Sequence, residues 1–356
     1  MTSQGFDFET VMRPDLPAPA GRWGGFPDFN FVGGHNAPEN IPTDALIEAA
    51  TRVLKREGLT LATYSLESGP QGYRPLREFL ATKLGRDAGM TCSADDILLT
   101  SGSLQGLDLI NEVMLAPGDT VLIEEATYGG CLTRFQRLGV TAVGIKLDEQ
   151  GMRTDHLAET LEKLAAEGTK PKFIYVIPTV QNPTASIMPL ERRKELLRLA
   201  EQYDVAVIED ECYSDLIWDG QRPPALHALD TTGRVVFVGS FSKSIAPALR
   251  VGFIVSPWPI MARLLSCKTD AGSGSLEQMV LAEFCNTHFE SHVVELNKTL
   301  KQKCDVLIEA MEKNFGTVAE FETPPGGIFL WVKLPAEIDT SRLAAEAAKH
   351  GIQVNP

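Results

Sequence analysis

The sequence has no apolar run long enough to cross a membrane, no basic excess and no closely paired cysteines. Its 33 Lys and Arg stand against 47 Asp and Glu, and the net charge of −14 argues against broad binding to nucleic-acid phosphates. The opening residues, MTSQGFDFET, lack the basic start and the apolar core of a secretion signal. We therefore expect a soluble cytoplasmic protein with no nucleic-acid partner and no membrane partner.

The six cysteines are scattered and never form Cys-x-x-Cys. This spacing favours free thiols in a reducing compartment over a disulfide framework or a zinc site. His288 and His292 are four residues apart and would share one helix face, but the segment HFESH does not match the zinc motif His-Glu-x-x-His. We interpret these two residues as a surface histidine pair and expect no metal.

Short apolar runs rich in β-branched residues alternate with amphipathic segments through the middle of the chain. The predicted strands are 120–125, 141–147, 172–178, 205–210, 234–240 and 250–256. Strands that are apolar on both faces and alternate with helices indicate an α/β fold, with a mostly parallel central sheet covered by helices.

The pattern changes beyond about residue 266. A long helical region over 276–315 precedes the turn TPPGG, an alternating strand over 328–334 and a further helix from residue 341. We predict a large domain over 43–266 and a smaller α+β domain formed by 1–42 and 267–356. The hydroxyl of Thr43 is expected to cap the first helix of the large domain.

Side chains that can bind or react follow four of the predicted strands at the point where each strand ends. They are Tyr128, Asn182, Asp210 with Tyr213, and Lys243. In open parallel sheets, ligands bind beyond the carboxyl ends of the strands. The sequence therefore predicts an active site at one edge of the sheet.

Ser101, Gly102 and Ser103 open the amphipathic segment SLQGLDLI. Glycine allows close backbone approach, the hydroxyls can donate hydrogen bonds, and the N–H groups of a first helical turn have no helical partner. Such a turn suits a phosphate. An ordinary helix start has the same pattern, so this turn alone does not identify the ligand.

Together these residues resemble the motifs of the fold-type I pyridoxal 5′-phosphate (PLP) aminotransferases of classes I and II. The branch that fits best contains the 2-aminoadipate and kynurenine aminotransferases and the aminotransferase-like domains of MocR-type regulators. The resemblance runs from about Val32 to the end of the chain. The matching motifs are GYRPLREFL (72–80), TSGSLQGLDLI (100–110), PTVQNPTA (178–185), IEDECYSDL (208–216), GSFSKSIAPALRVGFI (239–254) and PPGGIFLWV (324–332).

The resemblance implies an enzyme that moves an amino group from an L-amino acid to a 2-oxo acid, usually 2-oxoglutarate, in ping-pong half-reactions. Lys243 would hold the cofactor as a Schiff base and then transfer the substrate proton. Asp210 would pair with the ring nitrogen. Asn182 and Tyr213 would hydrogen-bond the 3′-oxygen, and Tyr128 would stack on the ring.

The resemblance also implies a set of donors for the cofactor phosphate. They are Ser101, Gly102, Ser103, Leu104, Ser240, Ser242 and Arg250, with Leu104 contributing through its backbone alone. Tyr64 would reach the phosphate of the partner subunit in a homodimer. Gly33, Gly34 and Asn182 would line the substrate.

Three other interpretations compete with transamination. Ser240-Phe241-Ser242-Lys243 also fits the Ser-x-x-Lys nucleophile motif of β-lactamases, but the companion motifs Ser-Asp-Asn and Lys-Thr-Gly are missing. The same cofactor supports other lyase and synthase reactions of amino-acid metabolism. MocR-type regulators use the fold as a non-catalytic PLP-binding sensor behind a DNA-binding domain, for which we expect no room in this chain.

The sequence stops at HGIQVNP, where the related aminotransferases continue into a segment with the arginine that holds the substrate carboxylate. We therefore expect a truncated chain and assign no residue to that role. His35 and Asn36 replace the Leu-Pro pair that is usual in a loop with substrate contacts. The identity of the donor amino acid is left open.

Overall fold

The computed structural model describes residues 6–14 and 16–356, apart from the side chain of Leu66. The chain forms two compact units, of which one is His35–Pro335 and the other combines Met1–Gly34 with Ala336–Pro356. The first five residues of the predicted small domain lie outside the described part. The domain limits expected from the sequence, 43–266 for the large domain and 1–42 with 267–356 for the small one, remain a prediction.

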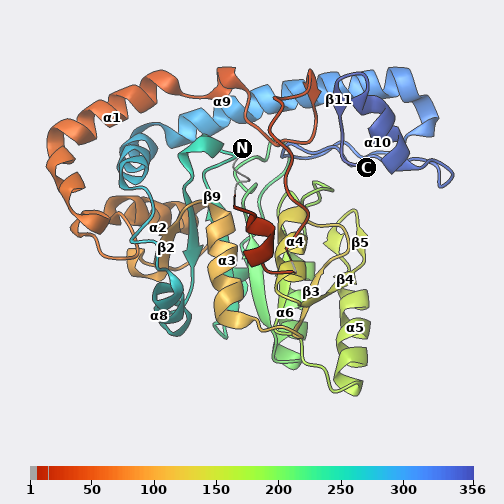
Figure 1. Cartoon of the computed structure of the whole chain (residues 1–356), viewed down its shortest axis with the longest axis horizontal. Helices are drawn as coiled ribbons and strands as arrows, with labels where there is room; N and C mark the ends of the chain where they lie inside the picture. The colour runs from red at the N-terminus through yellow and green to blue at the C-terminus, as the bar shows by residue number, and fades with distance from the viewer. Residues whose placement is uncertain (1–5, 15) are drawn as a thin grey trace. The chain divides into compact units, whose positions relative to one another are not determined.

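A seven-stranded sheet runs through the unit His35–Pro335 (Figure 1). Its strands, in spatial order, are β2 (Ile97–Thr100), β10 (Gly252–Val255), β9 (Val235–Ser240), β8 (Ala206–Asp210), β7 (Phe173–Val176), β3 (Thr120–Glu124) and β4 (Thr141–Ile145). β10 pairs antiparallel with β2 and β9, and the other neighbours pair in parallel. This arrangement confirms the predicted α/β fold with a mostly parallel sheet.

Helices cover both faces of this sheet, because the strands are apolar on both faces. The α-helices of the unit are α1 (Thr43–Glu57), α2 (Arg74–Ala88), α3 (Ser103–Met114), α4 (Gly129–Arg137), α5 (Thr154–Ala166), α6 (Leu190–Gln202), α7 (Leu226–Leu229), α8 (Trp258–Cys267) and α9 (Ser275–Phe315). Short 3₁₀ helices are η2 (Pro38–Asn40), η3 (Gly58–Ala62), η4 (Tyr64–Glu67), η5 (Ala94–Asp96), η6 (Pro247–Leu249) and η7 (Gly316–Val318). A two-stranded hairpin joins β5 (Leu147–Asp148) to β6 (Gly151–Met152).

Alternate residues of each strand enter different cores, as the period of two along a strand requires. In β2, Leu98 packs with α3, α4 and α8, whereas Ile97 and Leu99 pack with α1, α2 and α9. In β7, Phe173 and Tyr175 belong to the first of these cores, and Ile174 packs with α5 and α6 in a third. The two faces are therefore buried independently, and each strand end is held firmly at the sheet edge.

The other unit contains η1 (Phe8–Val11), β1 (Phe29–Asn30), α10 (Thr340–Ala348) and β11 (Ile352–Gln353). β1 pairs in parallel with β11, so the two ends of the chain meet in this unit. The Asp339 carboxylate caps α10 by accepting a hydrogen bond from the backbone N–H of Arg342. Within the described part of the chain, no helix has both the length and the apolar character that crossing a membrane requires.

All six predicted strands are present in shortened form. The seven-stranded sheet also contains one strand that was not predicted, and the structure differs from two other predictions. The segment 97–100 is the strand β2, which the sequence analysis did not identify. The predicted strand over 328–334 is wrong: the segment forms one isolated bridge, Glu320 to Lys333, while Ile328 and Phe329 pack against Tyr213. Thr43 is the first residue of α1 rather than its cap, and Pro42 takes the capping position.

We predict that Gly252→Ala destabilises the sheet where β10 begins. A methyl group there would lie 2.4 Å from the backbone nitrogen of Ser103 and 2.6 Å from the carbonyl carbon of Gly102. Because both are backbone atoms, the overpacking should lower the free energy of unfolding by about 1–3 kcal/mol. Urea unfolding measures the change. Gly129→Ala is the control, since a methyl group there meets nothing within 4 Å and should change the value by less than about 0.5 kcal/mol. Equal losses would contradict the prediction.

Candidate active site

The predicted site residues of the unit His35–Pro335 lie mostly at one edge of the seven-stranded sheet. Asp210 is the last residue of β8, and Ser240 is the last residue of β9. Tyr128 precedes α4 in the loop after β3, and Asn182 lies in the loop after β7. Parallel strands present their carboxyl ends at the same edge, so the sheet topology places these residues together.

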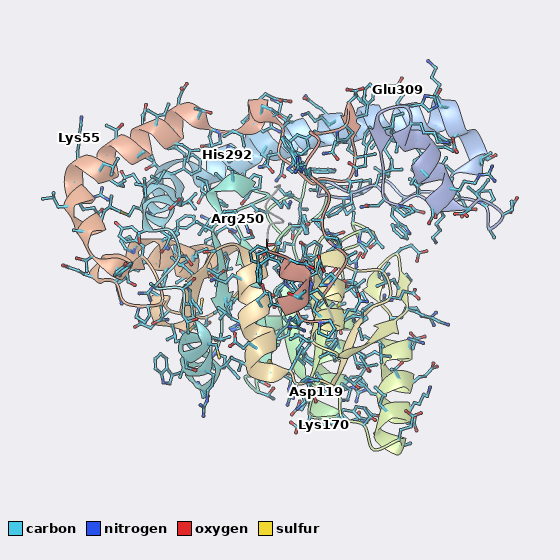
Figure 2. The ribbon with its side chains drawn as sticks, in the orientation of Figure 1. Lys55, Asp119, Lys170, Arg250, His292 and Glu309 are labelled. Atoms are coloured by element: carbon cyan, nitrogen blue, oxygen red, sulfur yellow. The ribbon has the colours of Figure 1, made fainter. Side chains whose placement is uncertain are left out.

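Arg250 joins this edge because β10 runs the opposite way. It lies two residues before β10, whose first residue Gly252 pairs with Thr100 of β2 and with Ser240 of β9. The guanidinium of Arg250, which Figure 2 labels, donates to the carbonyl of Ser101 (3.3 Å) and to that of Pro247 (3.1 Å). It remains exposed, so it can also face a ligand.

The turn before α3 forms a cradle around this guanidinium. Gly102 has φ 78°, and a Cβ at this position would lie 2.2 Å from an Arg250 nitrogen. Only glycine therefore allows the charge to sit against the turn. Ser103 begins α3 without a side-chain cap, so the first N–H groups of the helix are directed at the same region. A cation beside a helix start is a good binding site for an anion.

The other predicted donors of this cradle are placed differently from one another. The hydroxyls of Ser240 and Ser242 lie 3.0 Å apart, and the N–H of Ser242 donates to the Ser240 hydroxyl (3.1 Å). The N–H of Ser101 donates to the Gln105 side chain (2.7 Å). The Leu104 side chain packs against the sheet core, in keeping with a role for its backbone alone.

Asp210 is a buried carboxylate held at both of its oxygens. The Tyr175 hydroxyl donates to Oδ2 (2.8 Å), and the backbone N–H of Cys212 donates to Oδ1 (3.2 Å). Burial raises the pKa of Asp210, and the hydrogen bonds from Cys212 and Tyr175 oppose this rise. A carboxylate oriented in this way can hold a proton on a facing ring nitrogen.

Asn182 and Tyr213 lie beside each other, although they follow different strands. The Asn182 amide donates to the Tyr213 hydroxyl (3.2 Å), and the Tyr213 ring packs edge-on against Phe329 with centroids 4.8 Å apart. Burial raises the pKa of Tyr213 and also that of Tyr128, so both phenols stay protonated near neutral pH. They can therefore donate hydrogen bonds to a ligand oxygen.

Lys243 lies half-buried in the turn that follows β9. Burial lowers the pKa of Lys243; the nearby Cys212 opposes the effect, and the positive charge of Arg250 adds to it. A lysine of this kind is neutral more often than a surface lysine. It is therefore better suited to nucleophilic and proton-transfer chemistry.

Two buried residues that the sequence analysis did not identify support the Asn182 loop. Glu124, the last residue of β3, accepts hydrogen bonds from the Gln181 amide (3.1 Å) and from the N–H of Ile177 (3.2 Å). Gln181 also donates to the carbonyl of Ala126 (2.8 Å). Burial raises the pKa of Glu124 to about 8. The sequence offered one signal for Glu124, because a carboxylate stands at the end of the apolar run of β3. This strand pairs with β7, which leads into the Asn182 loop.

Some predicted residues are not joined to this group. Tyr64, in η4, is 84% exposed, and within the described residues no hydrogen bond links it to the other site residues. Gly33 and Gly34 belong to the unit that contains the chain ends, where the N–H of Gly33 donates to the Asn30 side chain (3.0 Å). His292, which was interpreted as half of a surface pair, is half-buried, and its ring lies 2.8 Å from the Ser244 carbonyl.

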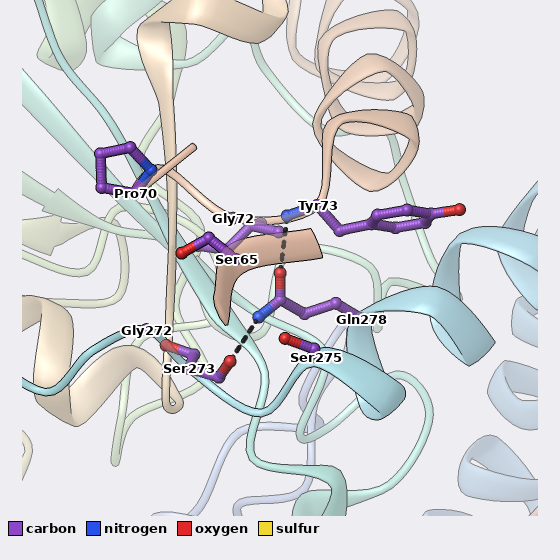
Figure 3. Close-up of a pocket in the computed structure, with 9 residues that line it drawn as sticks. Ser65, Pro70, Gly72, Tyr73, Gly272, Ser273, Ser275 and Gln278 are labelled. Carbon is purple, nitrogen blue, oxygen red and sulfur yellow. Dashed lines mark hydrogen bonds between the residues drawn. The ribbon is translucent and has the colours of Figure 1, made fainter. Parts of the chain in front are cut away.

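A separate small hollow lies beside Tyr73 (Figure 3). Its lining includes Gln278, whose amide accepts from the N–H of Tyr73 (2.8 Å) and donates to the carbonyl of Ser273 (3.1 Å). None of the predicted site residues lines it. The hollow is therefore distinct from the sheet-edge site.

The sheet-edge residues fit a phosphorylated pyridine aldehyde. The Gly102 cradle offers an anion site with a guanidinium, a buried carboxylate ends the strand next to β9, and a lysine of lowered pKa supplies an amine. Phosphate, ring nitrogen and aldehyde each require one of these groups.

Comparison with known proteins points to one family. The family model described as "Aminotransferase class I and II" matches residues 34–356. The aromatic-amino-acid aminotransferase 1 of Thermococcus litoralis is 34% identical over 92% of this chain and 79% of that protein. The uncharacterized HTH-type transcriptional regulator YdfD of Bacillus subtilis is 36% identical over 80% of this chain and 59% of the regulator. LysN, an alpha-aminoadipate aminotransferase of Thermus thermophilus solved with N-(5′-phosphopyridoxyl)-L-leucine, is 31% identical with a TM-score of 0.83, covering 91% of this chain and 81% of that one.

We predict that Glu124 makes the stability of the cofactor-free protein fall as the pH rises from about 4.5 to about 8. In this range the folded chain keeps the Glu124 proton while the unfolded chain releases it, so the free energy of unfolding decreases by at most about 1.4 kcal/mol per pH unit. Glu124→Gln cannot ionise and should flatten the slope, as measured by urea unfolding across this range. The control is Glu125→Gln, an exposed neighbour, which should change the stability by less than about 0.5 kcal/mol at each pH. An unchanged slope in Glu124→Gln would contradict the prediction.

Proposed function

The chain belongs to the class I and II aminotransferases and is a pyridoxal phosphate-dependent transaminase, and we propose that it transfers the amino group of an L-amino acid to 2-oxoglutarate with Lys243 as the lysine that binds the cofactor. One observation carries the assignment: β9, β8 and β2 end at the same sheet edge and bring Lys243, Asp210 and the Gly102 cradle into one group.

When bound, pyridoxal phosphate supplies a carbonyl carbon that takes up the amino group and a ring that withdraws the electron pair from the substrate Cα. Lys243 Nζ attaches the cofactor, and its lowered pKa favours the neutral amine that this step needs. With cofactor and substrate bound, Lys243 Nζ would be the base that moves the substrate Cα proton.

Asp210 keeps the cofactor ring nitrogen protonated. Its carboxylate cannot rotate away, because Tyr175 and the N–H of Cys212 hold its two oxygens. Asn182 and Tyr213 donate hydrogen bonds to the ring oxygen, and the Tyr128 ring covers one ring face. The protonated ring nitrogen is what makes the ring an effective electron sink.

The phosphate is held by the cradle. Arg250 supplies a charge-assisted hydrogen bond, and the donors around it are Ser101, Gly102, Ser103, Leu104, Ser240 and Ser242. Gly33 and Gly34 are proposed to contact the substrate carboxylate, and Asn182 is proposed as a further substrate-binding residue. The named activities of the relatives support an aromatic or 2-aminoadipate-like amino acid as the donor, and a branched donor is the third class to test.

The proposal is tested by adding L-amino acids one at a time to the PLP-loaded protein and recording the visible spectrum. We expect one donor class to convert the band of the lysine-bound cofactor into that of its aminated form, and 2-oxoglutarate to reverse the change. Lys243→Ala should show no lysine-bound band although the protein stays folded by circular dichroism. A retained band in Lys243→Ala would refute the role of this lysine. Failure of 2-oxoglutarate, with reversal by another 2-oxo acid, would refute the acceptor alone.

We also propose a homodimer in which Tyr64 contacts the phosphate of the partner subunit. Support comes from an exposed apolar surface that runs from α1 through η3 to η4. Leu59 is 94% exposed and Tyr64 84% exposed, and Ile47, Leu54 and Leu61 are also exposed. Large exposed apolar surface of this kind marks an interface with another protein. A second copy of the chain would bury it and complete the phosphate site.

We predict that Tyr64→Phe weakens PLP binding about tenfold or more, because the phosphate loses one charge-assisted hydrogen bond. Mixing Tyr64→Phe chains with Lys243→Ala chains tests whether Tyr64 acts on the phosphate of the partner subunit. A mixed dimer has one site with both an intact Lys243 and a partner's intact Tyr64, so part of the lysine-bound band should regain wild-type affinity. Light scattering gives the oligomeric state. A monomer, or no recovery in mixed dimers, would contradict the shared site.

A further inference from the structure

The turn that carries Lys243 is held at three successive carbonyls by side chains from other parts of the chain. The chain leaves β9 and makes a single helical turn, in which the N–H groups of Ile245 (2.9 Å) and Ala246 (3.3 Å) donate to the Phe241 carbonyl. Pro247 follows and has no N–H to donate. Within the described residues, no backbone N–H reaches the carbonyls of Ser244 or Ile245. Buried carbonyls of this kind need other donors.

Two side chains from distant parts of the chain supply those donors. The Asn36 amide donates to the Ile245 carbonyl (3.1 Å) and to the Lys243 carbonyl (3.4 Å). The His292 ring lies 2.8 Å from the Ser244 carbonyl. Because a carbonyl oxygen can only accept, this contact requires the proton on His292 Nε2. All three carbonyls are thereby satisfied from outside the turn.

His292 is itself held in a fixed place. It projects from α9, the longest helix of the unit (Figure 2), and its ring packs edge-on against Phe284, with centroids 5.7 Å apart. Phe284 is fully buried in the core between α9, α1 and α2. The contact with Ser244 therefore ties the Lys243 turn to a rigid core and not to a loop.

We infer that Asn36 and His292 are positioning residues for Lys243, a role that rests on the proposed function of this lysine. The lysine must meet the cofactor carbon and then the substrate Cα proton, and errors of about 1 Å at such a centre can reduce the rate about a hundredfold. Holding the backbone that directly follows the Lys243 side chain limits where Nζ can reach. The Asn36 amide is thereby committed to the turn and not to the substrate.

The chain offers a matched control for His292. His288 lies one helical turn earlier on α9, and its ring packs on the same Phe284 at 5.7 Å. His288 Nε2 is buried and has no hydrogen-bond partner within the described residues. Replacing either histidine by Phe keeps a ring on Phe284, but His292→Phe alone removes a donor from the Lys243 turn.

The experiment measures how fast cofactor-free protein attaches added PLP, followed by rapid-mixing absorbance of the lysine-bound band. This rate reports on Lys243 directly and does not depend on turnover. We expect His292→Phe to slow attachment about tenfold, the size expected from one lost hydrogen bond, and His288→Phe to match the wild type. His292→Gln, whose amide can donate to the Ser244 carbonyl, should recover most of the rate. In the amino-acid half-reaction, His292→Phe should lower the maximal rate while the donor concentration for half saturation changes less than about twofold.

Equal attachment rates in His292→Phe and His288→Phe would overturn the positioning role of His292. If His292→Phe does not fold, the variants Asn36→Leu and His292→Gln are measured in its place. The inference is overturned if Asn36→Leu attaches PLP at the wild-type rate while His292→Gln attaches it slowly. The proposed function fails in a different way, because wild-type protein would then attach no PLP at Lys243.

Discussion

The site depends on the antiparallel pairing of β10 between β2 and β9. Gly252, the first residue of β10, pairs with Thr100 at the end of β2 and with Ser240 at the end of β9. Three segments therefore meet at one residue: the cradle before α3, the turn of Lys243 and the arginine that precedes β10. The absence of a side chain at Gly252 lets their backbones approach closely enough for Arg250 to rest on Gly102.

The charges at the end of β8 illustrate how this arrangement is stabilised. Glu209, Asp210 and Glu211 are consecutive and buried, and each carboxylate has its own partners. Glu209 accepts from the backbone of α7, Asp210 from Tyr175, and Glu211 from the Thr179 hydroxyl. Arg193, fully buried within 4 Å of both glutamates, donates to the carbonyls on either side of the Asn182 loop. Buried charges are costly unless they are paired in this way, so the loop and the strand end are held in one arrangement.

Several features could be predicted because they depend on short stretches of sequence. Apolar runs of the right length identified six of the seven strands of the large sheet, and the motifs between them identified the family. β2 was missed because its apolar run is only the three residues before Thr100, whereas the equally short β7 and β10 lie within longer runs that are rich in β-branched residues. The segment 328–334 alternates like a strand but lacks a neighbouring strand to pair with, so Ile328 and Phe329 serve instead to pack Tyr213.

The sequence by itself determined the class of fold, the family and the residues that reach the sheet edge, because hydrophobic period and motif order are local properties of the chain. Only the tertiary structure decided which groups support those residues. Tyr175 reads as one more apolar strand residue until β7 places it against Asp210, and His292 reads as a surface residue until α9 brings it to the Lys243 turn. Asn36 and Lys243 are 207 positions apart. A hydrogen bond over such a separation depends on how helices and strands pack, and no spacing in the sequence encodes it.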